Sequence, residues 1–291
     1  DIYNPPFVTT PGVLEALEGL DPDVVDFHYR WAPSYTKAMK RYRGKWVFTF
    51  HNTYGEGHGL NRIPSLINDA LFCRIIRKRR VICITEFIKG DLLKRGFDPA
   101  LLDVIPPGIE VPPEVGTEGD YILFIGRLVG TKGIPYLIKA MDQVDGRLIV
   151  VGDGPERERL ESVVRKAGVG EKVTFTGRVS EERKIELLSN CKVFAMPSLF
   201  ESYGLAVAEA MSYGKPVVAS RVGGLPEAVG DGGVLTPPKD SKAIAAALNQ
   251  LLKDDEVREA TARRAREHIL RFSWDNIVQD VEAAYRRVAE E

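Results

Sequence analysis

The sequence predicts an α/β protein built from two domains, each with a parallel sheet. Short apolar segments alternate with longer helical segments along most of the chain, and this order is typical of parallel strands connected by helices. A segment rich in proline and glycine, residues 105–119, interrupts the alternation and is followed by a new apolar segment. The length of 291 residues suits two domains of ordinary size.

The first half of the chain supplies the first predicted domain, residues 1–112. Strands are expected at 23–28, 45–51 and 81–85, and helices at 32–43, at 63–80 and from residue 86 to Arg95. The chain begins with Asp1 and not with methionine, and no leader-like segment precedes the first strand. We therefore expect this domain to be incomplete at its start.

The second half repeats the pattern and predicts a second domain, residues 113–272. Strands are expected at 121–126, 147–152, 172–177, 191–198, 215–220 and 232–237, with helices beginning at Ile134, Pro155, Ser180 and about Tyr203. An amphipathic helix is expected to close the chain at 273–291. Ligands of open α/β sheets bind at the carboxyl ends of the strands, so the loops that follow these strands are the candidate site.

Composition excludes several classes of protein. Hydrophobic residues make up 44% and charged residues 28% of the chain, as in soluble globular proteins, and no apolar run is long enough to span a bilayer. The net charge of -1 does not favour a nucleic-acid partner. Three cysteines without metal-ligand spacing suit a reducing compartment, so a cytoplasmic location is expected.

A loop after the first strand of the second domain carries two cations. The sequence GRLVGTKG places Gly126, Arg127 and Lys132 directly after the strand at 121–126. Arginine can bind a phosphate in bidentate fashion and lysine can act as a mobile point charge, so the pair could neutralise a leaving diphosphate. The alternative is two solvated cations on an ordinary loop. Because these cations could take the place of a metal ion, no metal and no cofactor is expected.

Two glutamates flank a predicted helix start further along the second domain. Glu201 precedes the helix, Glu209 lies within it, and the backbone amides of Tyr203, Gly204 and Leu205 would form an anion site at its N-terminus. A pyrophosphate could lie between the two carboxylates, with Glu201 near the sugar and Glu209 at the ribose hydroxyls. The alternative places Glu201 at a helix start and Glu209 on the surface.

Together these motifs resemble glycosyltransferase family 4, retaining enzymes of the GT-B fold with two Rossmann-like domains that face each other across a cleft. The resemblance rests on GRL-x-x-x-KG, GDGP, E-S-x-G-L-x-x-x-E-A-M and G-x-PVVAS-x-x-GG-x-x-E. It implies that the second domain binds the nucleotide-sugar donor and the first domain the acceptor, with residues 273–291 packing back on the first domain.

The resemblance also implies roles for single residues. Arg127 and Lys132 would hold the diphosphate, Glu209 the ribose, and Glu201 would lie beside the donor sugar. Arg178 and Val179 would hold the base through backbone contacts. The predicted donor-binding residues are Gly126, Arg127, Lys132, Arg178, Val179, Glu201, Tyr203, Gly204, Leu205 and Glu209.

One histidine of the first domain is a further candidate for catalysis. His51 ends the predicted strand KWVFTFH, and its position matches the family histidine that faces the donor sugar. The alternative is a structural histidine, which is the more common role of a lone one. His58 has a weaker claim, and His28 is expected to be a packing residue at the end of a strand.

Two further motifs are expected to be structural. GDGP at 152–155 lacks the spacing of a dinucleotide-binding loop, and Pro155 suits the first turn of a helix. The basic clusters at 37–45 and 77–80 are expected to be solvated helix ends. The alternative for these clusters is peripheral contact with an anionic membrane that carries a lipid-linked acceptor.

The sequence thus predicts a retaining, metal-independent hexosyltransferase that uses a UDP-, GDP- or ADP-sugar. The acceptor would be a hydroxyl of a glycan, a lipid or a small molecule. The alternative is a nucleotide-sugar-binding module or an inactive fragment of such an enzyme, which the expected incompleteness of the first domain keeps open.

Overall fold

A computed structural model describes residues 12–28, 33–51, 62–113, 116 and 118–291, and the chain forms two compact units. Unit 1 comprises Asp1–Pro106 and Ile277–Glu291, and unit 2 comprises Pro107–Asn276. Both boundaries lie a few residues from the expected ones. The shift has a structural reason, because Ile109 pairs with Ser273 and donates its amide to the Phe272 carbonyl, 2.8 Å away, which joins the linker segment to unit 2.

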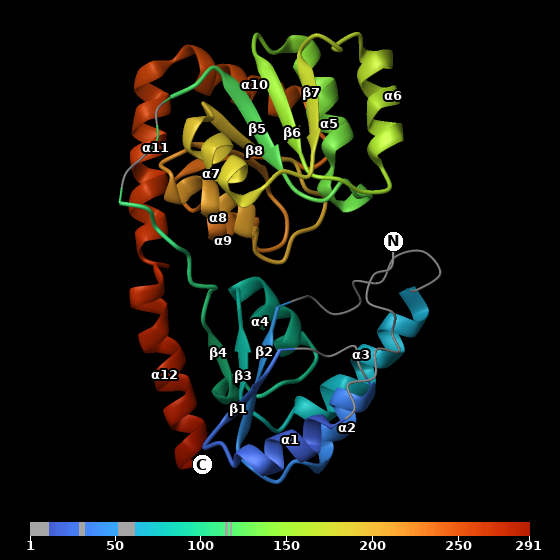
Figure 1. Cartoon of the computed structure of the whole chain (residues 1–291), viewed down its shortest axis with the longest axis vertical. Coiled ribbons are helices and arrows are strands. Elements are labelled where there is room, and N and C mark those ends of the chain that lie inside the picture. The colour runs from blue at the N-terminus through green and yellow to red at the C-terminus, as the bar shows by residue number, and fades with distance from the viewer. Residues whose placement is uncertain (1–11, 29–32, 52–61, 114–115, 117) are drawn as a thin grey trace. The chain divides into compact units, whose positions relative to one another are not determined.

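Unit 1 contains a parallel sheet with the strand order β1-β2-β3-β4 (Figure 1). Its strands are β1 Val25–Phe27, β2 Trp46–Phe50, β3 Val81–Cys83 and β4 Leu102–Val104. Its helices are α1 Val13–Leu20, α2 Pro33–Arg41, α3 Arg62–Ile76, α4 Glu86–Lys94 and the 3₁₀ helix η2 Pro99–Leu101. Every residue of β2 is buried, as expected of a strand covered on both faces.

The sequence analysis missed α1 and β4. α1 has apolar residues at helical spacing in VLEALEGL, so its pattern was a usable signal, although no residue of the helix is buried. Strand β4 has three residues and carries Asp103 in its middle, so it forms no apolar run. Pairing with β3 makes it a strand.

The last helix, α12 Trp274–Glu290, contributes its larger part to unit 1. The hydroxyl of Tyr285 donates to Asp26 at 2.7 Å, and Arg287 donates to Asp103 at 2.9 Å. Both acceptors lie on strands of the first half of the sequence. The end of the chain is thus part of unit 1.

Unit 2 contains a six-stranded parallel sheet with the order β10-β9-β8-β5-β6-β7 (Figure 1). Its strands are β5 Tyr121–Ile125, β6 Arg147–Val151, β7 Val173–Gly177, β8 Val193–Met196, β9 Val217–Ser220 and β10 Gly233–Thr236. Strand β5 pairs with β6 on one side and with β8 on the other, so the order reverses between β5 and β8. This reversal is the topological switch point, where open α/β sheets bind ligands.

The helices of unit 2 pack around this sheet. α5 contacts α6 and α10, α8 contacts α7, α9 and α11, and α10 contacts α11. The helices are α5 Ile134–Ala140, α6 Arg157–Ala167, α7 Glu181–Asn190, α8 Leu205–Ser212, α9 Leu225–Val229, α10 Ser241–Lys253 and α11 Asp255–Leu270, with 3₁₀ helices η3 Gly130–Lys132 and η4 Met141–Gln143.

Two helix starts differ from the predicted ones. α6 begins at Arg157, so Pro155 lies in the turn before the helix and not at its first position. α8 begins at Leu205 and not at Tyr203, because Gly204 has a φ of 103°, which no helical residue adopts. The predicted start of α7 is close, since Ser180 caps it by accepting a hydrogen bond from the Arg183 amide at 3.3 Å.

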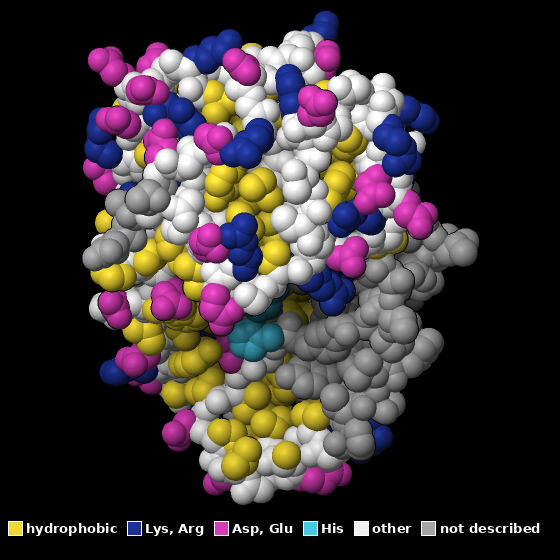
Figure 2. Space-filling model, turned by 45° about the horizontal axis from the view of Figure 1, so that its top comes forward, with side chains coloured by type: hydrophobic (Ala, Val, Ile, Leu, Met, Phe, Trp, Pro, Cys, Tyr) yellow, Lys and Arg dark blue, Asp and Glu magenta, His cyan; other side chains and the backbone are white. Residues whose placement is uncertain are grey.

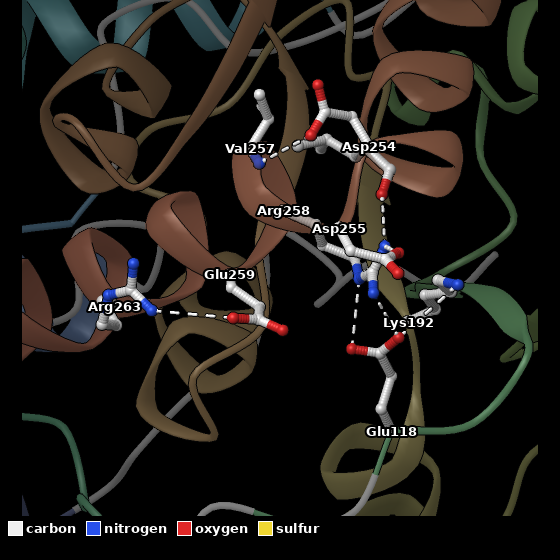
Figure 3. A network of polar contacts seen from close by, with 9 residues as sticks. Glu118, Lys192, Asp254, Asp255, Val257, Arg258, Glu259 and Arg263 are labelled. Atoms are coloured by element: carbon white, nitrogen blue, oxygen red, sulfur yellow. Dashed lines mark hydrogen bonds and ion pairs between the residues drawn. The ribbon is translucent and has the colours of Figure 1, made fainter.

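A polar network ties the segment before β5 to α11 (Figure 3). Arg258, whose side chain is 6% exposed, places Nη2 2.8 Å and Nε 3.1 Å from the two carboxylate oxygens of Glu118. Its Nη1 donates to Asp255 at 2.6 Å and to the Leu251 carbonyl at 3.2 Å. A buried guanidinium with this many acceptors holds two distant segments of unit 2 in one geometry.

The surface shows mixed charge. On the face drawn in Figure 2, basic and acidic side chains of the described residues are interspersed, with apolar side chains between them. Among the helices that the structure describes, none is both long enough and apolar enough to cross a membrane.

Candidate functional site

The candidate site of unit 2 lies at the switch point of its sheet. Lys132 follows β5 on η3, Glu201 follows β8, and their Nζ and Oε2 atoms are 2.5 Å apart. The side chains are 21% and 16% exposed, and the Ser198 hydroxyl donates to the same Glu201 oxygen at 3.4 Å. Two predicted site residues from segments far apart in the sequence therefore form one ion pair.

The backbone holds the two loops together. The amide of Leu199 donates to the Thr131 carbonyl at 2.7 Å. Gly133 has a φ of +64°, and a Cβ there would stand 2.0 Å from the Pro197 carbonyl oxygen. A side chain at this position would force the loops apart, so the glycine is required for their contact.

A third loop, after β9, closes against Glu201 in the same way. The Gly224 amide donates to the Glu201 carbonyl at 3.0 Å. Gly223 has a φ of +55°, and a Cβ there would lie 1.9 Å from that carbonyl oxygen. The backbone of Glu201 is therefore fixed on both sides.

Arg127 is exposed on the loop that follows β5. The loop is anchored to the GDGP turn after β6, because the Leu128 amide donates to the Asp153 carbonyl at 3.0 Å. A Cβ on Gly126 would lie 3.9 Å from the Lys132 Cε atom, which places the stem of Lys132 beside Gly126. Gly126, Arg127 and Lys132 thus share one loop, and the GDGP turn supports it.

The N-terminus of α8 adds backbone donors beside Glu201. The Gly204 carbonyl accepts from the amides of Val207 and Ala208, and no side chain caps the helix. The amides of Leu205 and Ala206 lie in the first turn, where no intrahelical acceptor exists, and such amides bind anions. Tyr203 precedes the helix, and burial raises the pKa of its hydroxyl well above the usual range.

Glu209 projects from α8 toward α7. Its Oε1 atom lies 3.3 Å from Lys184 Nζ, which also contacts Glu181 at 2.7 Å. Burial lowers the pKa of Lys184, but the two carboxylates outweigh it and raise the pKa above its ordinary value. Glu209 is therefore ion-paired and partly exposed, with 37% of its side chain accessible.

The predicted base-binding pair lies after β7. Arg178 is exposed and Val179 is half-buried. Gly177 precedes them with a φ of +74°, so the chain turns sharply as it leaves the sheet. No contact links this loop to the Lys132–Glu201 pair among the hydrogen bonds of the described residues.

In unit 1 the carboxyl ends of β1 and β2 carry a second polar cluster. His28 follows β1, His51 follows β2, and His28 Nδ1 lies 2.8 Å from His51 Nε2. Asp26 Oδ2 lies 3.4 Å from His28 Nε2. The Thr49 hydroxyl donates a hydrogen bond that both carboxylate oxygens of Asp26 share, at 2.9 and 2.8 Å. The hydroxyl of Tyr285 donates to the same carboxylate.

The two histidines differ in pKa. The hydrogen bond to Asp26 raises the pKa of His28 above 6.5, although burial opposes it. Burial lowers the pKa of His51, and the neighbouring His28 lowers it further. A proton therefore resides on His28 before it resides on His51.

Sequence reasoning assigned His28 to packing, and this was wrong. Its side chain is 53% exposed and hydrogen-bonded to His51. The Asp26-x-His28 pattern at a strand end was a usable signal, because alternate residues of a strand point to one face. Tyr285 could not be found this way, since it comes from the other end of the chain. His58 and the glycines around it lie outside the described residues.

The basic cluster at 77–80 makes contacts within unit 1. Arg77 donates to the Gly96 carbonyl at 2.9 Å, and Arg80 donates to Glu291 at 2.6 Å. The guanidinium of Arg79 lies 4.9 Å from the centroid of the Trp46 ring. These three cations are therefore engaged and not simply solvated helix-end charges.

No group of three or more histidine, cysteine, aspartate or glutamate side chains in the described part of the chain could hold a metal ion. The sequence contains one Asp-x-Asp pair, Asp21 and Asp23, which precedes β1 in unit 1. The described loops offer phosphate ligands in Lys132 and the α8 amides.

Residues 110–268 match the family model described as glycosyl transferases group 1, and residues 3–111 match glycosyltransferase family 4. An uncharacterised glycosyltransferase of Methanocaldococcus jannaschii is 35% identical over 59% of this chain and 46% of its own length. A D-inositol 3-phosphate glycosyltransferase of Corynebacterium urealyticum is 30% identical over 92% of this chain and 72% of its own length.

The first relatives are longer than the matched part. The alignments cover 46% and 60% of the two Methanocaldococcus jannaschii proteins, so the chain spans about half the length of the curated relatives it matches.

Solved structures show the same architecture. Sucrose-phosphate synthase of Thermosynechococcus elongatus superposes with a TM-score of 0.80 at 26% identity, over 96% of this chain and 77% of that one. HepE of Anabaena in complex with UDP and glucose gives 0.79 at 22% identity, over 97% and 80%. The fold is GT-B, and the chain belongs to the group 1 family of glycosyl transferases.

Proposed function

We propose that this chain transfers a hexose from a nucleoside diphosphate sugar to a hydroxyl acceptor, with unit 2 holding the donor. The observation that carries the proposal is the Lys132–Glu201 ion pair across the β5/β8 switch point. A cation that could bind phosphate there lies next to a carboxylate that can accept hydrogen bonds from sugar hydroxyls. The uncapped α8 N-terminus beside it supplies amide donors for a diphosphate.

The names of similar proteins support this donor class. HepE of Anabaena has been solved with UDP and with UDP-glucose, and other relatives are D-inositol 3-phosphate glycosyltransferases and an α-D-kanosaminyltransferase. A UDP-, GDP- or ADP-linked hexose is therefore the donor class we infer. The acceptor is a hydroxyl of a glycan, a lipid or a small molecule. We infer that transfer takes place in the cytoplasm or at the cytoplasmic face of a membrane.

The chemistry we infer is transfer with retention and without a metal ion. Arg127, Lys132 and the α8 amides would stabilise the negative charge that develops on the leaving diphosphate. The departing phosphate would take the proton of the acceptor hydroxyl. His51 and Glu201 would orient the hexose, and Glu209 would bind the ribose, with Arg178 and Val179 near the base.

The sharpest test is a panel of UDP-, GDP- and ADP-hexoses measured by calorimetry in the presence of a chelator. We expect one nucleotide series to bind and its affinity to stay unchanged when magnesium is added. Binding that appears only with a divalent metal would contradict the metal-independent mechanism. The anomeric configuration of the product, read by proton NMR, decides retention.

A matched pair of variants separates the donor site from the fold. Lys132→Ala should bind the nucleotide series that the wild type accepts more weakly. Lys139→Ala is the control, because Lys139 is exposed in the last turn of α5. Equal loss in both variants would remove the site assignment.

A further inference from the structure

The histidine pair of unit 1 forms a chain of hydrogen bonds that runs from a carboxylate to an exposed imidazole. His28 lies between Asp26, 3.4 Å from its Nε2, and His51, 2.8 Å from its Nδ1. The two rings meet edge to edge, with centroids 5.1 Å apart and planes at 28°. Two ring nitrogens at this distance must share one proton, because two N–H groups or two lone pairs would repel each other.

Only two arrangements of protons satisfy this geometry while His51 is neutral, because the Asp26 carboxylate requires a proton on His28 Nε2. When His28 is an imidazolium, it donates from Nε2 to Asp26 and from Nδ1 to His51 Nε2. His51 then carries its own proton on Nδ1 and offers a donor there. When His28 is neutral, its proton stays on Nε2 beside Asp26, so His51 must donate from Nε2 and keeps a lone pair on Nδ1.

We propose that His28 is a positioning residue whose protonation state decides whether His51 offers a hydrogen-bond donor or an acceptor from Nδ1. The role of His51 toward a sugar donor rests on the proposed function. The coupling between the two rings belongs to unit 1 alone. A phosphate oxygen only accepts hydrogen bonds, so only the donor state of His51 can bind one.

The surroundings of the pair determine the direction of the switch. The described groups that face it are Asp26 on β1 and, through that carboxylate, the hydroxyls of Thr49 on β2 and Tyr285 on α12. Burial and Asp26 raise the pKa of Tyr285, so its hydroxyl stays a neutral donor. Asp26 raises the pKa of His28 above 6.5, whereas burial lowers the pKa of His51. His51 is therefore a donor at low pH and becomes an acceptor as the pH rises through the raised pKa of His28.

Nitrogen NMR of the whole chain tests this without any nucleotide sugar. The sequence has four histidines, so long-range ¹H–¹⁵N spectra of ¹⁵N-labelled protein can be assigned with single variants. We expect His28 to titrate above pH 6.5 and the His51 proton to move from Nδ1 to Nε2 over the same pH range. A His51 tautomer that stays constant through the titration of His28 would overturn the proposal.

Three variants complete the experiment. In His28→Asn the amide can still hydrogen-bond His51 but does not titrate, so the His51 tautomer should not change with pH. His28→Phe, which removes the hydrogen bond, should also abolish the change in tautomer. His268→Gln is the control, because His268 on α11 belongs to unit 2 and bonds the Glu227 carbonyl at 3.1 Å. It should leave the His51 titration as in the wild type. A pH-dependent tautomer that survives in His28→Asn would overturn the proposal, whether or not the chain transfers a sugar.

Discussion

Two ion pairs of unit 2 use similar groups in different surroundings. Arg258 grips Glu118 with two nitrogens and has further acceptors in Asp255 and the Leu251 carbonyl. Lys132 makes a single contact with Glu201 at the end of two adjacent strands. A planar arginine fork fixes geometry, whereas a lysine on a flexible stem can move toward an incoming phosphate. The comparison teaches that the number of bonds at each cation separates an architectural pair from a candidate functional one.

The largest expected effect tests the functional side of this comparison. Lys132→Ala should lower kcat about 10²- to 10³-fold, the range for loss of one group that stabilises charge in a transition state. The unfolding midpoint should change little, because the side chain is partly exposed. Steady-state kinetics with the nucleotide sugar found by the panel, beside a thermal melt, measure both. A large fall in the melting temperature would instead make the pair architectural.

The second prediction concerns the architectural pair. Arg258→Met should reduce the free energy of unfolding by about 3 kcal/mol, at the low end of the range for breaking a buried pair, since Glu118 remains 44% exposed. Urea unfolding measures this change. Nucleotide affinity of the folded variant should equal that of the wild type. Weaker nucleotide binding by the variant, measured where it is fully folded, would mean that the Arg258 network also shapes the nucleotide site.

A third substitution sharpens the assignment of Glu209, which is ion-paired yet proposed to bind ribose. Glu209→Ala should weaken binding of the free nucleoside diphosphate by about 1.5–3 kcal/mol, the loss expected for a hydrogen bond to a charged group. Lys184→Gln is the matched comparison, because it removes the partner and keeps the carboxylate. Calorimetry should show a smaller loss for Lys184→Gln. If the two losses are equal, the ion pair and not a ribose contact explains the effect.

The smallest expected effect is on stability in unit 1. Because the pKa of folded His28 is raised above 6.5, its interaction with Asp26 stabilises the fold below pH 6.5, and this contribution disappears as the pH rises through the raised value. The His28 side chain is half exposed, so the pH-dependent change should be a small fraction of the total free energy of unfolding. The urea midpoints of wild type and Asp26→Asn should differ at pH 6 and converge at pH 9, provided that Thr49 and Tyr285 accommodate the amide. In His28→Asn, which keeps the Asp26 carboxylate, this pH dependence of the urea midpoint should disappear.

The alternation of apolar and helical segments determined the fold class and most strands from the sequence alone. It works for strands such as β2, whose residues are all buried, because burial on both faces requires an apolar run. It fails for β4, where Asp103 interrupts a three-residue strand that exists through pairing with β3. Short strands depend on their neighbours and not on local pattern.

The same division holds for the two sites. The sequence proposed Lys132, Glu201 and His51 as site residues from motifs and from their places after strands, which is local information. Only the tertiary structure brought Lys132 within 2.5 Å of Glu201, and Tyr285 to the carboxylate that faces His28. These contacts depend on strand order and on the path of the last helix, because residues far apart in the sequence carry no pattern that marks them as neighbours.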